Sequence, residues 1–279
     1  ALPALWKLYG GMSIWCCTEE IKIISIENKC KLRRSIMDWR KFLSGMPAND
    51  YVVQDIPYEE QIKASAKLIK DADYILIGAG AGLSTAAGMT YSGRRFEDNF
   101  GEFIKKYGVT DMYSAGFYPF PSEEAMWGYW SKNSYINCIE PAALPLYKKL
   151  FNLIKNKKYF VLTTNVDRQF HKAGFDENKI FATQGDYSRI QCMRGCHKKI
   201  YDATKMFIQM NQAIKDCLIP AYMVPKCPVC GGPMAMHLRC DEYFVEDKMW
   251  DKAAQCYANY IDEIRGHKVL LLELGVGFN

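Results

Sequence analysis

The sequence contains no long hydrophobic segment and little excess charge of either sign. No apolar run approaches the about 20 residues that a transmembrane helix needs, so we expect no membrane partner. The 36 Lys and Arg residues nearly balance the 31 Asp and Glu residues, leaving a net charge of +5. Because so small an excess does not favour a nucleic-acid surface, we expect no nucleic-acid partner either.

The start of the sequence shows no recognisable secretory signal. The first seventeen residues lack the charged-then-apolar order of such a signal. The eleven cysteines, an odd number, therefore favour a reducing compartment, with thiols or bound metal, and we expect a cytoplasmic protein. With 49% apolar residues, the 279-residue chain can form one large domain and a small module.

Both ends of the chain suggest missing sequence. There is no initiator methionine before Met12, so the chain looks cut at its front or extended upstream of its true start. Residues 1–36, which include Cys30, receive no role, and we interpret the adjacent Cys16 and Cys17 as inert thiols rather than a site. At the other end we count about four strands where a doubly wound fold has six, and we expect a truncated C-terminus.

A glycine-rich turn organises the first half of the sequence. The apolar run 74–77 meets Gly78, Gly80 and Gly82, and a helix pattern of small residues follows from Ser84. Strand, glycine turn and helix start together form a seat for a dinucleotide pyrophosphate, because glycine permits positive φ and close approach to a ligand. The alternative is a turn that serves packing only.

Three further strand candidates end in polar or glycine-rich segments. They span 159–162, 180–183 and 269–274, and helix patterns cover 58–71, 96–107 and 144–156. This order predicts an α/β doubly wound, Rossmann-like parallel sheet. Ligands of such sheets lie beyond the carboxyl ends of the strands.

The aromatic segment 111–137 supports two interpretations. Its spacing is typical of a helical core cluster under a loop. In the other interpretation, Tyr113, Phe117 and Phe120 line a pocket for the acceptor or nicotinamide.

Two cysteine pairs predict a structural zinc ion. Cys192 and Cys196 are followed, thirty residues later, by the Cys-Pro-Val-Cys knuckle of Cys227 and Cys230. We place this module at 191–240, with a helix over 198–210, inserted into a nucleotide-binding domain of residues 37–190 and 241–279. The other possible ligands, which make no paired knuckle, are Cys217, Cys240, His197 and His237.

The segment from Gly80 to Gly88, GAGLSTAAG, resembles the cofactor loop of the sirtuins. Ordinary sirtuins continue with Pro-Asp-Phe-Arg, whereas this chain has Thr-Tyr-Ser-Gly at 90–93, which resembles the macrodomain-linked branch. The resemblance runs from Met37 to the last residue and implies NAD as co-substrate. By that resemblance and the strand-end pattern, the residues expected to contact NAD are Gly80, Ala81, Gly82, Thr85, Tyr91, Arg95, Asp167, Gly275, Val276, Gly277 and Asn279. A simple turn is the alternative for the last four, and a surface charge the alternative for Arg95.

The segment Asn165-Val166-Asp167 resembles the Asn-Ile-Asp motif of sirtuins. The resemblance implies that Asn165 binds the nicotinamide ribose and a water molecule, and that Asp167 holds the nicotinamide side. Alternatively, both residues cap the next helix, at 168–173.

Gln184 stands where ordinary sirtuins have a catalytic histidine. Glutamine exchanges no proton at accessible pH and can only orient groups by hydrogen bonds, so histidine-driven deacylation should be crippled. We therefore expect a protein mono-ADP-ribosyltransferase with Asn165 and Gln184 as catalytic residues. The branch resemblance implies a lipoylated acceptor similar to the H protein of glycine cleavage, a macrodomain hydrolase as functional partner, and a role in oxidative stress. The rivals are an NAD-dependent deacylase and a non-catalytic NAD or ADP-ribose sensor.

Overall fold

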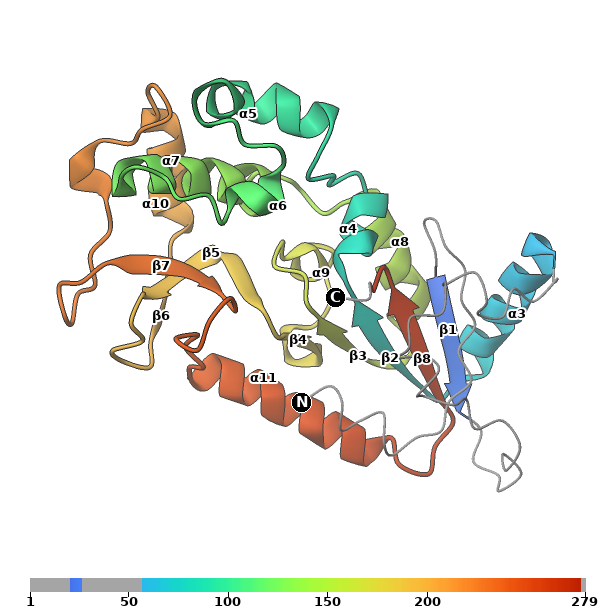
Figure 1. The fold of residues 1–279 in the computed structure, drawn as a ribbon. Coiled ribbons are helices and arrows are strands. Elements are labelled where there is room, and N and C mark those ends of the chain that lie inside the picture. Colours follow the sequence, from blue (N-terminus) through green and yellow to red (C-terminus); the bar gives the residue numbers. More distant parts are fainter. Residues whose placement is uncertain (1–20, 27–56, 277–279) are drawn as a thin grey trace, which may run out of the picture.

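The computed structural model describes residues 57–276 in full and the backbone of residues 21–26 (Figure 1). The predictions for Cys16, Cys17, Gly277 and Asn279 lie outside these residues. Among the helices described, none is long and apolar enough to cross a bilayer.

A five-stranded sheet forms the larger part of the molecule, with the order β1-β8-β2-β3-β4. Four of its strands run parallel, and β1 (Ile21–Ile26) lies antiparallel along β8 at the edge. The parallel strands are β2 (Tyr74–Ala79), β3 (Lys158–Thr163), β4 (Ile180–Ala182) and β8 (Val269–Leu274). The predicted parallel α/β sheet is therefore confirmed.

Alternating side chains bury both faces of this sheet. Ile75 and Ile77 of β2 pack in one core cluster with residues of α8 (Pro145–Ile154). Tyr74 points to the opposite face, where it joins the cluster covered by α11 (Lys248–Glu263). Figure 1 shows α11 lying along that face. The sequence patterns did not predict α11, although Asp247 caps it by accepting hydrogen bonds from two backbone amides.

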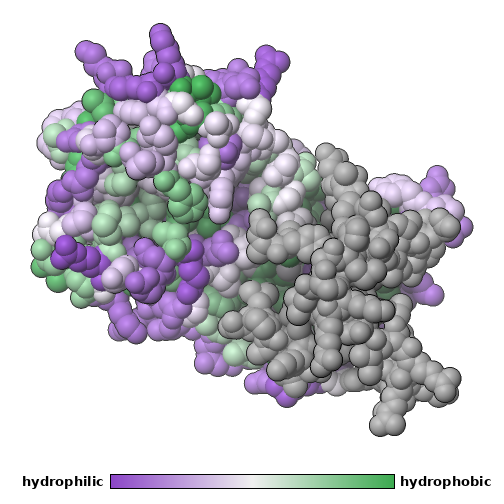
Figure 2. Space-filling view, in the orientation of Figure 1, coloured by the Kyte–Doolittle hydropathy of each residue, from purple (hydrophilic) through white to green (hydrophobic). Residues whose placement is uncertain are grey.

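The other helices connect the strands or lie beside the sheet. Beside the nucleotide-fold strands are α3 (Tyr58–Asp71), α4 (Ala81–Ala86), α9 (Gln169–Lys172) and the 3-10 turn η3 (Glu177–Lys179). A separate group consists of α5 (Arg94–Tyr107), α6 (Met112–Ala115), α7 (Glu123–Ser134) with its π-helical continuation η2 (Tyr135–Ile139), and α10 (Thr204–Ala213). In Figure 2 hydrophilic side chains project from this group, with hydrophobic residues between them.

The aromatic segment 111–137 contributes mainly to a core. Phe120 stacks on the buried Tyr129, at 5.5 Å between ring centroids, and both belong to the cluster around Phe100. Tyr113 and Phe117 are instead 68% and 64% exposed and contact each other. The core interpretation therefore holds for Phe120, while a role of the two exposed rings in acceptor binding stays a prediction.

A second, three-stranded antiparallel sheet, ordered β6-β5-β7, forms the small module. Its strands are β5 (Gly185–Cys192), β6 (Ile200–Asp202) and β7 (Met234–Leu238). The predicted boundary at 191 falls inside β5. The helix predicted over 198–210 is wrong in its first part, because residues of β6 pair with β5 and α10 begins only at Thr204.

The four predicted zinc ligands come together at the end of this sheet. The sulfur atoms of Cys192, Cys196, Cys227 and Cys230 all lie within 4.8 Å of one another, and no other such group of His, Cys, Asp and Glu occurs among the described residues. The Cys192–Cys230 and Cys196–Cys227 sulfur separations are 3.7 and 3.6 Å. Four thiolates about 2.3 Å from a tetrahedral zinc ion would be roughly 3.8 Å apart, so the cluster fits zinc and leaves no ligand position open.

The turn between β2 and α4 packs directly on the backbone that follows β8. The Gly82 amide donates a hydrogen bond to the Gly275 carbonyl, at 3.0 Å. A Cβ atom at Gly80 would lie 2.6 Å from the Gly275 oxygen, and one at Gly82 would lie 2.8 Å from the Gly275 Cα atom. Gly275 itself has a φ of 62°, whereas Gly80 is extended. Close backbone approach is therefore the reason for glycine at positions 80 and 82.

We predict that the cysteine cluster binds one zinc ion per chain and that the ion stabilises the small module. Cys227→Ser should abolish stoichiometric zinc and lower the melting temperature, because the remaining thiolates cannot complete the tetrahedron. Cys240→Ser is the matched control, since Cys240 is an exposed free thiol outside the cluster. Metal analysis and thermal melts with and without a chelator measure both effects. Full zinc content in Cys227→Ser would contradict the assignment.

We also predict that Gly82→Ala destabilises the fold by about 1–3 kcal/mol, because the added methyl group meets backbone atoms that cannot move aside. Gly101→Ala in α5 is the control, since a Cβ there meets nothing within 4 Å. That control should be neutral or more stable by up to about 1 kcal/mol. Urea unfolding of the two variants measures the difference, and equal stabilities would contradict the close-packing account.

Candidate functional site

The carboxyl ends of three parallel strands meet at one edge of the large sheet. Backbone hydrogen bonds continue beyond the strands, because the Thr164 amide donates to the Ala79 carbonyl and the Thr183 amide donates to the Thr163 carbonyl. Asn165 and Gln184 follow directly on these two positions. The sheet therefore brings the glycine turn, the Asn165 segment and the Gln184 segment to one place, as the strand pattern predicted.

The Asn165 side chain is held with its nitrogen inward. Its Nδ2 atom donates to the carbonyl oxygen of Gly80, at 2.9 Å, and lies 3.3 Å from the hydroxyls of both Ser84 and Tyr147. A carbonyl can only accept a hydrogen bond, which fixes which end of the amide is nitrogen. The Oδ1 atom accepts no hydrogen bond from the described residues, so it is available to accept one from a ligand hydroxyl or water.

A chain of hydrogen bonds lies behind Asn165, and all of its donors point the same way along it. The Ser84 hydroxyl donates to Asp167 Oδ2, and this bond uses the single proton of the hydroxyl. The Tyr147 hydroxyl, 2.8 Å from Ser84 Oγ, must then donate to Ser84, and it can accept from Asn165. The donors thus point from Asn165 through Tyr147 and Ser84 to the Asp167 carboxylate.

Asp167 is buried, with 4% of its surface exposed. Burial raises the pKa of the Asp167 carboxyl, while the hydrogen bonds from Ser84 and from the Gln169 amide act in the opposite direction. Its Oδ1 atom accepts from that amide, at the first residue of α9, over 2.9 Å. The N-cap residue of α9 is Arg168, which makes no side-chain cap hydrogen bond, so the helix-capping interpretation does not hold in its simple form. The Asp167 carboxylate does satisfy the first amide of the helix, and it also anchors the chain behind Asn165.

Gln184 lies in the turn between β4 and β5 and is exposed. Its backbone carbonyl accepts from the Arg239 amide, at 3.0 Å, and no hydrogen bond of its side chain involves the described residues. The next position requires glycine, because Gly185 has a φ of 99° and a Cβ there would meet the His237 carbonyl at 1.9 Å. Contact between the Gln184 amide and a ligand stays a prediction.

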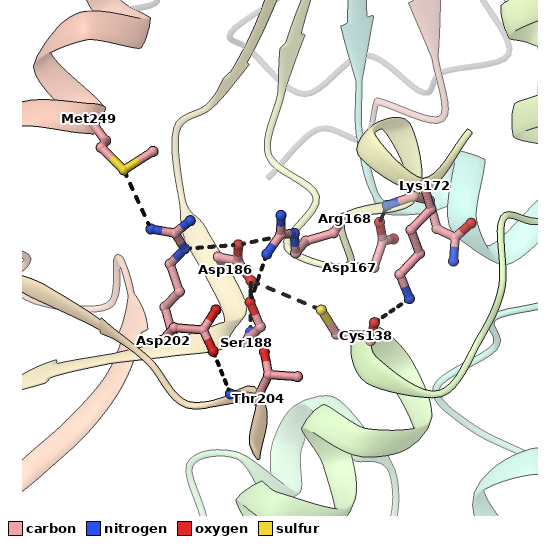
Figure 3. A network of polar contacts seen from close by, with 11 residues as sticks. Cys138, Asp167, Arg168, Lys172, Asp186, Ser188, Asp202, Thr204 and Met249 are labelled. Carbon is pink, nitrogen blue, oxygen red and sulfur yellow. Dashed lines mark hydrogen bonds and ion pairs between the residues drawn. The ribbon is translucent and has the colours of Figure 1, made fainter. Parts of the chain in front are cut away.

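An ionic network just after Gln184 joins the two sheets (Figure 3). Asp186 Oδ1 accepts from the amide and hydroxyl of Ser188, both at 2.7 Å. Its Oδ2 atom lies 3.6 Å from Arg168 Nε and 3.5 Å from Arg189 Nε. Because Arg168 directly follows Asp167 and Arg189 belongs to β5, these contacts fix the loops carrying Asn165 and Gln184 relative to each other.

The residues expected to contact the cofactor beyond the glycine turn have other partners as well. Tyr91 donates a hydrogen bond to the Tyr187 hydroxyl, at 3.2 Å, and Thr85 is exposed, with its hydroxyl bonded to the Ala81 carbonyl. Arg95 donates to the backbone carbonyls of Thr90 and Ile136, at 2.9 and 3.0 Å. The guanidinium thus ties the segment before α5 to η2, and a bond from Arg95 to phosphate remains a prediction.

The backbone amides of the glycine turn are mostly used within the protein. Those of Gly80, Gly82 and Leu83 donate to the carbonyls of Leu274, Gly275 and Gly80. The Ala81 amide has no hydrogen-bond partner among the described residues. Gly275 and Val276 lie beside this turn, so the structure brings together the predicted cofactor residues from both strand ends.

A cavity of about 200 Å³ extends from Asn165 and Asp167 between β4, β5 and α11. Two of the four histidines of the chain, His171 and His237, line it. His237 Nε2 is bonded to the Val245 carbonyl, at 3.0 Å, and no histidine is hydrogen-bonded to Asn165, Asp167 or Gln184. Burial lowers the pKa of both cavity histidines.

Two residues of this site were not identified from the sequence. Ser84 lies inside the glycine-turn motif and could have been found by asking which polar side chain the helix turns inward. Tyr147 gave no such signal, because an aromatic residue in an amphipathic helix is normally a core residue. It is a core residue here too, and only the fold brings its hydroxyl to Asn165.

Comparison with known proteins places the chain in a family. The Sir2 family matches residues 80–269. A protein ADP-ribosyltransferase of Staphylococcus aureus is 35% identical over 237 residues, covering 84% of this chain and 75% of the relative. A probable bifunctional ADP-ribose hydrolase/ADP-ribosyltransferase of Fusarium oxysporum f. sp. cubense is 31% identical over 238 residues, which is 80% of this chain and 39% of that protein.

Solved structures are more distant. A Sir2 homolog–NAD complex is 16% identical and has a TM-score of 0.42, with 62% of this chain and 59% of that chain covered. At that score the assignment rests on the sequence matches, which confirm the sirtuin resemblance and leave the macrodomain-linked branch a prediction. Since the family match spans more than half of the chain, and the staphylococcal relative aligns over most of both sequences, the chain belongs to the Sir2 family.

Proposed function

We propose that the protein is an NAD-dependent protein mono-ADP-ribosyltransferase, which transfers ADP-ribose from NAD to an acceptor protein and releases nicotinamide. The observation that carries this proposal is the pair of amides at the strand ends. The Asn165 side-chain amide is held through its nitrogen, which leaves Oδ1 available to a ligand, and Gln184 follows the neighbouring strand. Such groups orient ribose hydroxyls and an attacking group without exchanging protons. Both sequence relatives carry ADP-ribosyltransferase in their names.

In this proposal the residues of the chain bind and orient NAD as substrate. The Gly80–Gly82 turn and Gly275 receive the phosphate and ribose part, while Asn165 Oδ1 accepts a hydrogen bond from the nicotinamide ribose or a water molecule. Asp167 holds the nicotinamide side by way of the buried chain behind it. Cleavage of nicotinamide develops positive charge on the ribose, which positioning and nearby dipoles can favour without a general base.

The acceptor belongs to the proposal as well. We take it to be a lipoylated carrier similar to the H protein of glycine cleavage, with a macrodomain hydrolase that removes the modification and a role in oxidative-stress control. The hydrolase in the name of the Fusarium relative supports such a pairing. A reducing cytoplasm suits the eight cysteines of the described residues, none of which forms a disulfide.

We expect Asn165→Ala to reduce ADP-ribosyl transfer by roughly 100-fold or more, because the substrate loses an oriented acceptor of its hydroxyl. Transfer of label from radiolabelled NAD to carriers with and without the lipoyl group measures it. Asn259→Ala, which removes an exposed amide of α11, is the control and should match the unaltered protein. Gln184→Ala should also lose transfer. Unchanged transfer in Asn165→Ala would contradict the proposal.

Deacylation is the competing function, because His171 and His237 line the cavity that reaches Asn165. We expect no O-acyl-ADP-ribose from acylated peptides, because neither histidine is hydrogen-bonded to Asn165, Asp167 or Gln184, and His237 is already bonded to a carbonyl. Mass spectrometry of the products distinguishes deacylation from ADP-ribosyl transfer. Accumulation of O-acyl-ADP-ribose would establish a deacylase, and tight NAD binding without nicotinamide release would establish a sensor.

A further inference from the structure

Tyr147 is a fully buried residue of α8 whose hydroxyl reaches the candidate site. Its ring packs edge-to-face on Phe170, at 5.0 Å between centroids, within the core cluster beneath β2 and β3. Phenylalanine would fill the same space. A buried hydroxyl is unfavourable unless it is hydrogen-bonded, so packing alone gives no reason for it.

The hydroxyl of Tyr147 makes two contacts, both with site residues. It lies 2.8 Å from Ser84 Oγ and 3.3 Å from Asn165 Nδ2. Burial raises the pKa of the Tyr147 phenol, so it stays protonated and can donate at any working pH. Since Ser84 donates to Asp167, Tyr147 donates to Ser84 and accepts from Asn165.

These contacts decide the plane of the Asn165 amide. One N–H group of Nδ2 is directed to the Gly80 carbonyl, and the second is directed to the Tyr147 and Ser84 hydroxyls. An amide anchored through one N–H can still rotate about that bond, whereas an amide anchored through both cannot. The two anchors together fix the direction of Oδ1, which is the atom left for a ligand.

We infer that Tyr147 is a positioning residue for the proposed transfer reaction: its hydroxyl holds the Asn165 amide in the orientation that the substrate needs. This inference rests on the proposed function. Tyr147 itself touches no substrate and acts only through Asn165. The consequence is a contribution to turnover that exceeds its contribution to NAD binding.

Tyr147→Phe removes the hydroxyl and keeps the ring. We expect kcat for nicotinamide release and transfer to fall by about 10-fold, since one hydrogen bond that orients the reacting centre is lost, with the KM for NAD changed less than about 2-fold. Tyr159→Phe is the matched control. Tyr159 is a buried tyrosine of the same core cluster, its hydroxyl accepts from the Asp176 amide at 3.2 Å, and it contacts no site residue. A kcat in Tyr147→Phe equal to that of the control would overturn the inference.

A double-mutant cycle tests whether Tyr147 acts through Asn165. The variant with both Tyr147→Phe and Asn165→Ala should have the residual rate of Asn165→Ala alone, because the hydroxyl has nothing left to position. Rate losses that multiply would show that Tyr147 acts by another route and would overturn the inference.

A readout independent of activity separates this inference from the proposed function. The side-chain amide signals of Asn165, identified by their loss in Asn165→Ala, can be followed by ¹⁵N NMR. In Tyr147→Phe these signals should shift and their protons exchange faster, while Tyr159→Phe leaves them in place. Unmoved signals would refute the positioning role even if transfer is observed. If the signals move but the unaltered protein releases no nicotinamide and modifies no carrier, the contact is real, the proposed function fails, and the positioning role of Tyr147 in transfer fails with it.

Discussion

The contact between the Gly80–Gly82 turn and the backbone at Gly275 is the constraint on which the site depends. A hydrogen bond of 3.0 Å from Gly82 to the Gly275 carbonyl closes the contact, and neither turn glycine has room for a Cβ atom. The same turn places the Gly80 carbonyl where it receives the Asn165 amide, at 2.9 Å. The packing of two strand ends thus also sets the position of the Asn165 side chain on a third segment. A wider turn would displace both the Gly275 backbone and the Asn165 side chain.

The site built on this contact orients groups and has little capacity to take up protons. Asn165 has an amide, and the only carboxylate behind it already accepts from Ser84 and from the Gln169 amide. The nearby ionic network is similarly satisfied, because Asp186 is bonded to Ser188 and flanked by two arginines. A site of this kind suits a reaction whose barrier is lowered by position and dipoles, such as loss of nicotinamide from a held ribose. It suits poorly a reaction that requires a base on the enzyme.

The features predictable from the sequence are those set by local chemistry. Helical spacing of apolar residues predicted α3, and an apolar run predicted the strand at Val269–Leu274, both with their observed bounds. Cysteine spacing identified all four residues of the metal cluster. The features that escaped depend on tertiary context. The residues of β6 were predicted to be helical because their pairing with β5 cannot be seen locally. Helix α11 was missed, although it packs on one face of the four parallel strands.

The role of glycine shows the same limit at atomic scale. Sequence reasoning identified the turn correctly but attributed its glycines to positive φ and ligand approach, whereas Gly80 is extended and the approaching group is another part of the chain. Tyr147 is the complementary case, since its aromatic character correctly predicts burial and gives no hint of where its hydroxyl lies. One residue can thus pack its ring in the core and place its hydroxyl oxygen in the site. Sequence patterns predict the packing of the ring. The position of the hydroxyl follows only from the three-dimensional arrangement of α8, α4 and the Asn165 loop.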